Sequence, residues 1–383
     1  MNFLKELFYF FKFLSLKDEQ KEIVIYAEHD GYYPVYEGVI KELISQNIKI
    51  LYITSDPKDP VFDLNVKNLK VIYLNLLFTA VANYIKCKVL LITTPDLENF
   101  HLKRSPYPVH YLYLFHSMVS THMMYFEKAF DHYDSILCVG DYQIDEIRER
   151  EKKHNLKPKN LIPSGYYRLE RILDNHQPVK NDKPTILIAP SWGEQNILNE
   201  CGAKLIEMLL TADFKVIVRP HPEIVRRNKE VVTSIQNKFK GHENFKLELS
   251  VRNDDSLHNA DLMICDCSGV ALEYAFGTER PVLFLDLPVK IKNENYKDYS
   301  LSPIELKSRE QIGKLIESDL KDLIPSVHDL LQNKEKYREK IRNLREKLIY
   351  TKKNSSLIAS EYILKLVEQS QAQNTELLPS SRN

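Results

Sequence analysis

The chain has 383 residues, in which 53 Lys and Arg balance 53 Asp and Glu, so its formal net charge at pH 7 is zero. A neutral chain lacks the positive charge that general nucleic-acid binding requires, and we expect no nucleic-acid partner. Its five cysteines are scattered, which favours reduced thiols in a cytoplasmic protein over a disulfide framework. Cys265 and Cys267 have no second pair of ligands nearby, so we expect no metal site.

Residues 1–17 are rich in aromatic side chains and carry Lys5, Lys12 and Lys17 against Glu6. They lack the small-residue cleavage site of a signal peptide, and no run in the chain reaches the roughly 18 apolar residues that a membrane span needs. Two interpretations stay open: an amphipathic helix on the inner face of a bacterial cell membrane, or a helix packed against the first domain. The first would make the cytoplasmic protein a peripheral membrane protein.

Apolar runs of strand length alternate with helical patterns through residues 18–174, which predicts a first α/β domain with a parallel sheet. The expected strands lie at Glu22–Glu28, Ile48–Asp56, Leu69–Asn75, Lys88–Asp96, Val109–Ser117 and Ser135–Asp141.

Polar side chains follow the fifth of these runs. His116 can act as a general base, because an imidazole accepts a proton from a hydroxyl group near neutral pH. A helix is expected to begin near Ser120, with Ser120 or Thr121 as its cap and His122 in its first turn. Together with Ser117, these residues form the predicted acceptor side of the site.

The polar segment 175–184, with two prolines, is the predicted linker to a second α/β domain at residues 185–353. The expected strands of this domain lie at Thr185–Trp192, Phe214–Pro222, Phe245–Ser250, Asp261–Asp266 and Pro281–Leu287. Residues 354–368 are expected to form a further helix, and residues 369–383 lack apolar periodicity and are expected to be disordered.

The fourth run of the second domain ends in a small-residue turn, Ser268-Gly269, which a helical pattern follows. A helix N-terminus after such a turn favours phosphate groups, and Gly269 would let a ligand approach the backbone. Glu273, one turn into this helix, would reach ribose hydroxyl groups of a nucleotide.

Two other strand ends in the second domain carry polar groups. One run stops at Arg219 and His221, and another at Ser191. Ligands of open parallel sheets bind beyond the carboxyl ends of the strands, so these groups are expected to converge with Ser268 on a nucleotide diphosphate. His221 is given both a donor-binding and a catalytic role.

Several of these motifs occur in one order in a known family. The chain resembles the CDP-glycerol glycerophosphotransferases, the teichoic-acid primases and polymerases, over residues 109–345. The resemblance is carried by Phe115-His116-Ser117, Gly165-Tyr-Tyr-Arg168, Ala189-Pro-Ser-Trp192, Arg219-Pro-His-Pro222, Asp266-Cys-Ser-Gly269 with Glu273-Tyr-Ala275, and Arg280-Pro-Val-Leu-Phe284. It implies a GT-B-like architecture of two facing Rossmann-like domains, with the nucleotide held mainly by the second.

The resemblance also implies an activity: transfer of glycerol phosphate from CDP-glycerol to a hydroxyl group of a lipid-linked, surface-polysaccharide or teichoic-acid-like acceptor, with His116 as general base. The activated nucleotide is then a substrate, and no cofactor is expected. Three alternatives stay open: a GT-B glycosyltransferase that uses a CMP- or UDP-sugar in polysaccharide or lipopolysaccharide synthesis, a UDP-sugar 2-epimerase-like enzyme, and an inactive assembly scaffold.

Overall fold

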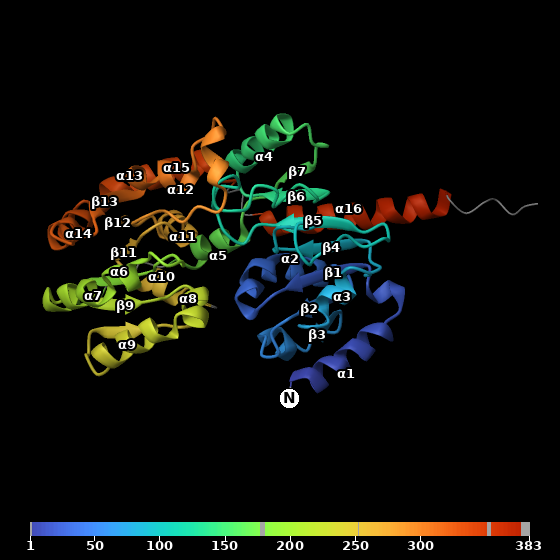
Figure 1. Ribbon diagram of the computed structural model, residues 1–383, viewed down its shortest axis with the longest axis horizontal. Helices are drawn as coiled ribbons and strands as arrows, with labels where there is room; N and C mark the ends of the chain where they lie inside the picture. The colour runs from blue at the N-terminus through green and yellow to red at the C-terminus, as the bar shows by residue number, and fades with distance from the viewer. Residues whose placement is uncertain (1, 177–180, 252, 351–353, 377–383) are drawn as a thin grey trace, which may run out of the picture. The chain divides into compact units, whose positions relative to one another are not determined.

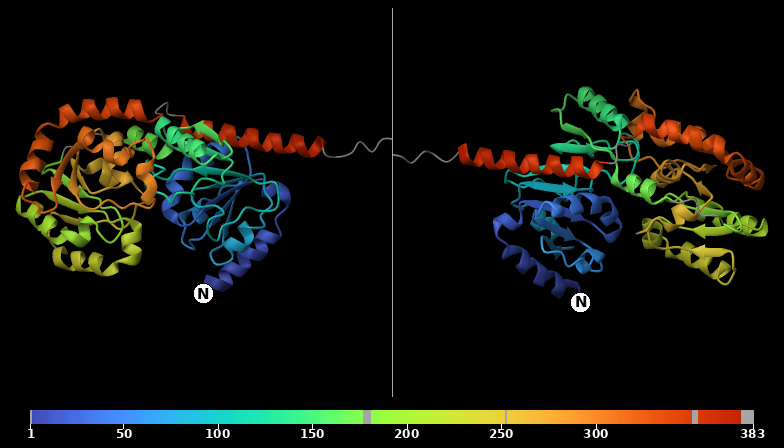
Figure 2. Two further views of the ribbon diagram at one scale, coloured as in Figure 1. Left: turned by 45° about the horizontal axis from the view of Figure 1, so that its top comes forward. Right: turned by 180° about the vertical axis from the view of Figure 1, so that it is seen from behind.

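The computed structural model describes residues 2–176, 181–251, 253–350 and 354–376. The chain divides into two compact units (Figure 1), each described here by itself. The first unit comprises Met1–His116, Phe126–Tyr167 and Lys352–Asn383, and the second comprises Ser117–Tyr125 and Arg168–Thr351. Both are built on parallel sheets between helices (Figure 2), which confirms the predicted α/β fold class.

Among the described residues, the sheet of the first unit has seven parallel strands in the order β3-β2-β1-β4-β5-β6-β7. These are β1 (Ile23–Ala27), β2 (Ile50–Thr54), β3 (Leu69–Tyr73), β4 (Val89–Ile92), β5 (His110–Leu114), β6 (Ser135–Cys138) and β7 (Asn160–Pro163). In the interior strand β1, every residue is buried, the pattern of a parallel sheet covered on both faces. Val24 pairs with Leu51 on one side and Leu90 on the other.

The helices of the first unit include the N-terminal and C-terminal helices of the described chain. They are α1 (Asn2–Leu14), α2 (Tyr33–Ser45), α3 (Phe78–Ala82), α4 (Asp141–Lys153) and α16 (Ser355–Glu376), with 3₁₀ turns η1 (Asp18–Gln20), η2 (Asp30–Tyr32) and η3 (Pro60–Asp63). α16 packs beside α2, and its Ile363 joins Tyr36 and Val39 of α2 in the apolar core.

The sheet of the second unit has six parallel strands within the described residues, in the order β10-β9-β8-β11-β12-β13. They are β8 (Thr185–Ile188), β9 (Lys215–Val218), β10 (Phe245–Leu247), β11 (Leu262–Cys265), β12 (Val282–Asp286) and β13 (Gly313–Glu317). β8 and β11 are neighbours, and later strands are added outward from each of them, so the order of the strands reverses between these two.

The helices of the second unit surround this sheet. They are α5 (Tyr167–Asn175, of which Tyr167 is counted in the first unit), α6 (Ile197–Glu200), α7 (Gly202–Thr211), α8 (Pro222–Arg227), α9 (Lys229–Phe239), α10 (Asp255–Asn259), α11 (Gly269–Thr278), η4 (Glu294–Asp298), α12 (Ile304–Lys307), α13 (Arg309–Ile312), α14 (Leu323–Gln332) and α15 (Lys334–Leu348).

The eleven expected strands all lie where the apolar runs predicted them, whereas β7 and β13 were missed. The chain passes from the first unit to the second between Tyr167 and Arg168, upstream of the predicted linker 175–184, of which residues 177–180 lie outside the described residues. α16 continues to Glu376, past the start of the predicted disordered tail, and residues 377–383 of that tail lie outside the description.

Gly38 lies where α2 is in close contact with Ser356 of α16 and with Tyr167. A Cβ atom on Gly38 would lie 2.0 Å from Ser356 Oγ and 2.4 Å from the Tyr167 ring. We therefore expect Gly38→Ala to lower the free energy of unfolding by about 1–3 kcal/mol, although alanine favours helix. Urea denaturation followed by circular dichroism measures this change. Ser45→Ala, at an exposed position of the same helix, should stay within about 0.5 kcal/mol of the parent; equal stability of the two variants would contradict the proposed clash.

Candidate functional site at the reversal point of the second sheet

The reversal of strand order between β8 and β11 defines where a ligand would bind in the second unit. Loops that leave neighbouring strands in opposite directions separate at the carboxyl ends of those strands and leave room for a ligand. The predicted donor residues Ser191 and Ser268 follow β8 and β11 directly, so the topology brings these two loops to the same edge of the sheet.

α11 begins at this edge, as the sequence predicted. Ser268 is its N-cap, and Ser268 Oγ accepts a hydrogen bond from Val270 N at 3.5 Å. The structure shows a packing reason for a glycine at position 269: a Cβ atom there would lie 2.0 Å from Ser117 Oγ. Gly269 is therefore needed for the packing of Ser117 against α11, whatever ligand the helix terminus binds.

Asp266, between Cys265 and Cys267, ties the two loops together. It is 3% exposed and accepts hydrogen bonds from Ser191 N at 2.7 Å, Cys267 N at 2.8 Å and Ile197 N at 3.3 Å. Burial raises the pKa of this carboxyl group, while these donors favour the charged form and oppose the rise. Asp266 had no predicted role, because its partners Ser191 and Ile197 lie 75 and 69 residues away in the chain.

Arg219, predicted to bind phosphate, is 4% exposed and is part of an internal network. Its guanidinium group donates to Ser256 Oγ at 2.9 Å and to the Asn253 carbonyl oxygen at 3.1 Å, and it lies 3.8 Å from Glu248. Burial lowers the pKa of this guanidinium group. Arg219 thus fixes the exit of β9 against α10.

Glu273, predicted to reach a ribose, is also buried. Its carboxylate accepts from Arg168 Nε at 2.8 Å, and a terminal nitrogen of Arg168 lies 3.2 Å from Asp254. Arg171 pairs with the other oxygen of Asp254. In the structure Glu273 is part of a buried set of ion pairs that joins α5, α11 and the N-cap of α10.

His221 caps α8 at the carboxyl end of β9. Its Nδ1 accepts a hydrogen bond from Glu223 N at 3.1 Å. With Nδ1 as acceptor, the proton of a neutral ring is on Nε2, which is then a hydrogen-bond donor. The ring centre lies 6.1 Å from that of Trp192, so the imidazole lies beside the loop after β8.

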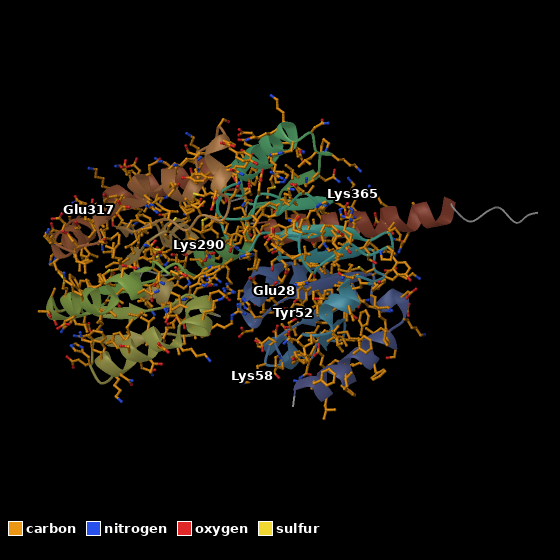
Figure 3. The ribbon with its side chains drawn as sticks, viewed as in Figure 1. Glu28, Tyr52, Lys58, Lys290, Glu317 and Lys365 are labelled. Atoms are coloured by element: carbon orange, nitrogen blue, oxygen red, sulfur yellow. The ribbon has the colours of Figure 1, made fainter. Side chains whose placement is uncertain are left out.

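Three cations surround Trp192, the single tryptophan of the chain. Lys290 lies over its ring, Arg227 is 5.5 Å from the ring centre, and Lys292 is 5.8 Å away. Burial, followed by the charges of Lys292 and Arg227, lowers the pKa of Lys290 to about 7 (Lys290 is labelled in Figure 3). This group of cations was not predicted from the sequence, although Lys290-Ile-Lys292 follows a predicted strand end.

The residues predicted for the acceptor side are grouped with the second unit. Residues 117–125 form turns, so the helix expected near Ser120 is absent. Glu305 accepts from Ser120 N at 3.0 Å and from Ser120 Oγ at 2.7 Å, and Thr121 is buried. His122 Nε2 is 3.0 Å from the Leu301 carbonyl oxygen. Ser120, Thr121 and His122 therefore anchor this segment.

His116 follows β5 in the first unit and is half-buried. Its ring packs edge-on against Tyr32 at 5.1 Å between ring centres, and Tyr32 in turn stacks on His29 at 4.2 Å. The His116 carbonyl oxygen accepts from Tyr166 OH at 2.9 Å. This hydrogen bond connects two of the motifs on which the sequence resemblance depends.

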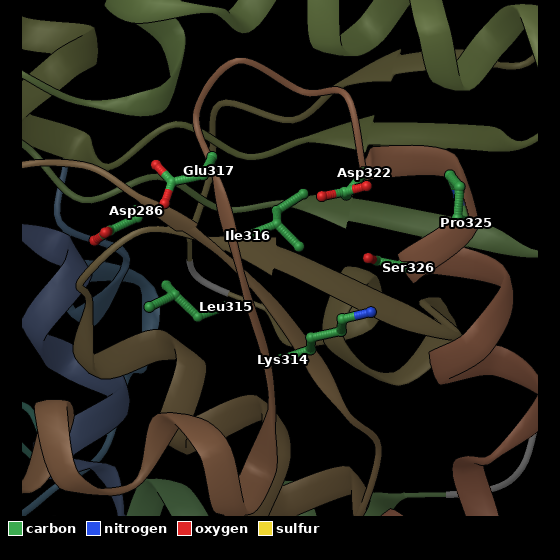
Figure 4. Close-up of a pocket in the computed structure, with 8 residues that line it drawn as sticks. All are labelled: Asp286, Lys314, Leu315, Ile316, Glu317, Asp322, Pro325 and Ser326. Carbon is green, nitrogen blue, oxygen red and sulfur yellow. The ribbon is translucent and has the colours of Figure 1, made fainter.

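A pocket lies at the edge of the second sheet, beside β13 and α14 (Figure 4). It is lined by Asp286, Lys314, Leu315, Ile316, Glu317, Asp322, Pro325 and Ser326. Three carboxylates against one lysine make it unsuited to a diphosphate.

Within the described residues, no cluster of His, Cys, Asp or Glu could hold a metal ion. Burial also raises the pKa of Cys267 to about 12, which disfavours the thiolate that zinc requires. In the same part of the chain, no helix is both long and apolar enough to cross a membrane.

Comparison with known proteins supplies the family. Residues 109–369 match the family model described as CDP-Glycerol:Poly(glycerophosphate) glycerophosphotransferase. No curated protein matches the sequence. Similar solved structures include a putative UDP-N-acetylglucosamine 2-epimerase from Listeria monocytogenes, with a TM-score of 0.57, 15% identity, and coverage of 92% of this chain and 97% of that one.

Two further structures show the same fold. The UDP-GlcNAc 2-epimerase from Neisseria meningitidis bound to UDP-GlcNAc has a TM-score of 0.55 and 14% identity, with 90% of this chain and 99% of that one covered. The glycotransferase of kitacinnamycin has a TM-score of 0.54 and 11% identity, with 90% and 98% covered. Glycosyltransferases and epimerases thus share this GT-B architecture with the chain.

The ion pairs of Arg168 yield a stability prediction. Arg168→Met leaves Glu273 and Asp254 buried with less compensating charge, so we expect a loss of about 3–5 kcal/mol in the free energy of unfolding. Urea titration of Trp192 fluorescence reports on the second unit alone, because that unit holds the single tryptophan. Arg338→Met, which removes an exposed pair with Glu335, is the matched control and should cost under about 1 kcal/mol. A similar loss in both variants would mean that the buried network contributes no more than a surface pair.

Proposed function

The chain belongs to the CDP-glycerol:poly(glycerophosphate) glycerophosphotransferase family, a family of transferases, and from this premise we propose that it transfers glycerol phosphate from CDP-glycerol to a hydroxyl group of a teichoic-acid-like or surface-polysaccharide acceptor. The acceptor oxygen forms a bond to the phosphorus that carries glycerol. The bond from that phosphorus to the bridging oxygen breaks, CMP leaves, and the hydroxyl proton passes to a base. The donor is a substrate, so the reaction needs no cofactor.

One observation carries the donor side of this proposal: Lys290, Lys292 and Arg227 gather at the carboxyl edge of a sheet whose strand order reverses there. Like charges repel one another, and Glu223, the carboxylate in this group, already pairs with Arg226 and Arg227. A diphosphate would neutralise the excess charge.

Two groups at the same edge add hydrogen-bond donors. His221 Nε2 can donate to a phosphate oxygen, since Nδ1 caps α8. The N-terminus of α11 at Ser268 adds backbone N–H groups and the positive end of the helix dipole. We assign the diphosphate to these groups and to the cations around Trp192, in place of Arg219 and Glu273. Phosphoryl transfer depends mainly on such positioning and charge neutralisation.

We assign the general base to His116. Its half-buried ring lies at the carboxyl end of β5, and Tyr166 holds its backbone, which restricts the ring position. We further infer that the enzyme works as a peripheral protein at a membrane surface, where lipid-linked acceptors lie.

A nucleotide-sugar glycosyltransferase is the second candidate, because the N. meningitidis neighbour binds UDP-GlcNAc on the same fold. The nucleotide released separates the candidates. Incubation with CDP-glycerol and acceptor should yield CMP, whereas a UDP-sugar-dependent transferase yields UDP. A 2-epimerase would convert its UDP-sugar without an acceptor, and a scaffold would release no nucleotide. Release of UDP alone from a mixture of CDP-glycerol, UDP-sugars and acceptor would overturn the proposed donor.

The pKa of Lys290 sets a pH dependence for donor binding. A bound diphosphate favours the charged lysine and raises its pKa above the free value of about 7. Donor affinity should therefore be constant below about pH 7. It should fall as the pH rises between the pKa of Lys290 in the free protein and its higher pKa in the complex. Burial opposes charge on Glu223, but the ion pairs with Arg227 and Arg226 outweigh it and lower the pKa of this carboxyl group, so Glu223 stays charged over this range. Titration of Trp192 fluorescence with CDP-glycerol between about pH 6 and 9 measures the slope.

Three variants test the assignment. Lys290→Arg should keep high affinity at the upper end of the range, because its charge does not titrate there. Lys290→Gln should bind weakly throughout, and Lys297→Gln, at an exposed lysine a few residues along the chain, should retain the parent profile. A Lys290→Gln protein with the parent's affinity and slope would remove Lys290 from the site.

The two histidines should have different kinetic signatures. His116→Ala is expected to lower kcat by about 100-fold or more with donor affinity nearly unchanged, the usual size of a general-base effect. His221→Ala should weaken donor binding as well as turnover, because its contact exists before the transition state. Steady-state kinetics and Trp192 titration give the two quantities.

His132→Ala, an exposed histidine of the first unit, is the matched control and should change neither quantity. Donor affinity lost at His116 and kept at His221 would mean that the roles of the two units are exchanged. Full activity of His116→Ala would exclude it as the base.

A further inference from the structure

α1 packs on the first unit through one side only. Glu6, which is 1% exposed, accepts from Asn75 N at 2.6 Å and from Leu77 N at 2.7 Å, just beyond β3. On the same side, Tyr9 contacts Phe62 with 5.6 Å between ring centres, and Phe13 is buried. The buried carboxylate and the aromatic contacts fix the helix beside β3 at the margin of the unit (Figures 1 and 2).

The other side of α1 is apolar and faces solvent. Phe3, Leu4, Phe8, Phe11 and Leu14 are 53%, 76%, 64%, 64% and 57% exposed. Leu4, Phe8 and Phe11 have the i, i+4, i+7 spacing that places side chains on one face of a helix. Monomeric soluble proteins rarely concentrate large apolar side chains in this way unless the patch contacts a partner.

The charges of α1 point to the partner. Glu6 is the single carboxylate of the helix and is turned inward, so it adds no negative charge to the outward side. Lys5 lies at one margin, bonded to the Pro57 carbonyl oxygen at 3.0 Å, and Lys12 lies over the Tyr9 ring at 5.4 Å. Lys17 follows the helix and is exposed. An apolar stripe bordered by lysines complements anionic lipid headgroups above an acyl interior.

The size of the face argues against a second protein copy. A 13-residue helix is about 20 Å long and about 10 Å wide, so its flat footprint is near 200 Å². A stable protein interface buries about 800 Å² on each partner. The helix is also too short to span a bilayer, which needs about 20 residues.

We propose that the outward face of α1 (Phe3, Leu4, Phe8, Phe11 and Leu14) inserts into the headgroup and acyl boundary of a membrane leaflet that contains anionic lipid, while the inward face holds the first unit to the helix. The inference depends on neither the donor nor the reaction. Because α1 is anchored by Glu6 and Phe13, deleting it would expose their partners and destabilise the unit, so substitutions on the outward face are the sharper test.

The experiment is co-sedimentation of the full chain with vesicles of phosphatidylcholine alone and with added phosphatidylglycerol. We expect binding to the anionic vesicles, and Phe8→Gln with Phe11→Gln should weaken it at least tenfold without lowering Tm. Lys12→Gln and Lys17→Gln should each weaken it by about fivefold, the usual contribution of one lysine near an anionic surface.

Phe100→Gln with Phe126→Gln is the matched control. These two exposed aromatic residues of the same unit lie away from α1 in the sequence and contact each other at 5.8 Å between ring centres. Their replacement should leave vesicle binding unchanged. Equal loss in both double variants, or no binding to anionic vesicles by the parent, would overturn the proposal. A dimer in light scattering that Phe8→Gln with Phe11→Gln dissociates, without lipid binding, would assign the face to a second copy.

Discussion

The arrangement of the carboxyl edge of the second sheet depends on the buried charges around Arg168. This arginine lies one residue beyond the boundary between the units and contacts both Glu273 of α11 and Asp254 at the cap of α10. Without Arg168, burying each of these charged carboxylates would cost folding free energy. Arg219 reaches the same helix α10 through Ser256, so the exits of β9 and β11 are held by one network. These buried ion pairs hold the strand exits in place from inside the second unit. A nucleotide bound at the surface would not need to contact them.

This network gives two motif residues a structural role that the sequence did not indicate. Arg219 and Glu273 have the chemistry of phosphate and ribose ligands, and Arg219 stands at a strand end while Glu273 lies one turn into a helix. Their partners Glu248 and Arg168 are distant in the sequence, and nothing in a local pattern shows that these charges meet. A short sequence motif can therefore contain residues that hold a binding site in place as well as residues that contact the ligand.

The strands could be predicted because parallel sheets bury both faces and leave continuous apolar runs. β7 and β13 escaped because they are outer strands with exposed or half-exposed positions, and their sequences Asn-Leu-Ile-Pro and Gly-Lys-Leu-Ile-Glu are too short and polar to stand out. The turn at Ser268 and the helix after it are local in the sequence and were predicted. Ser120 was misplaced because its partner Glu305 lies 185 residues further on, and Lys290 was missed because its burial over Trp192 is a tertiary effect.

The lowered pKa of Lys290 has a thermodynamic consequence for any anion that binds beside it. With a pKa of about 7, the free protein carries about half a proton on this side chain at pH 7. A bound diphosphate stabilises the ammonium form, so complex formation draws the missing fraction from the solvent. For the proposed donor, binding would therefore be a proton-uptake reaction, and its measured heat would include the ionisation heat of the buffer that supplies the proton.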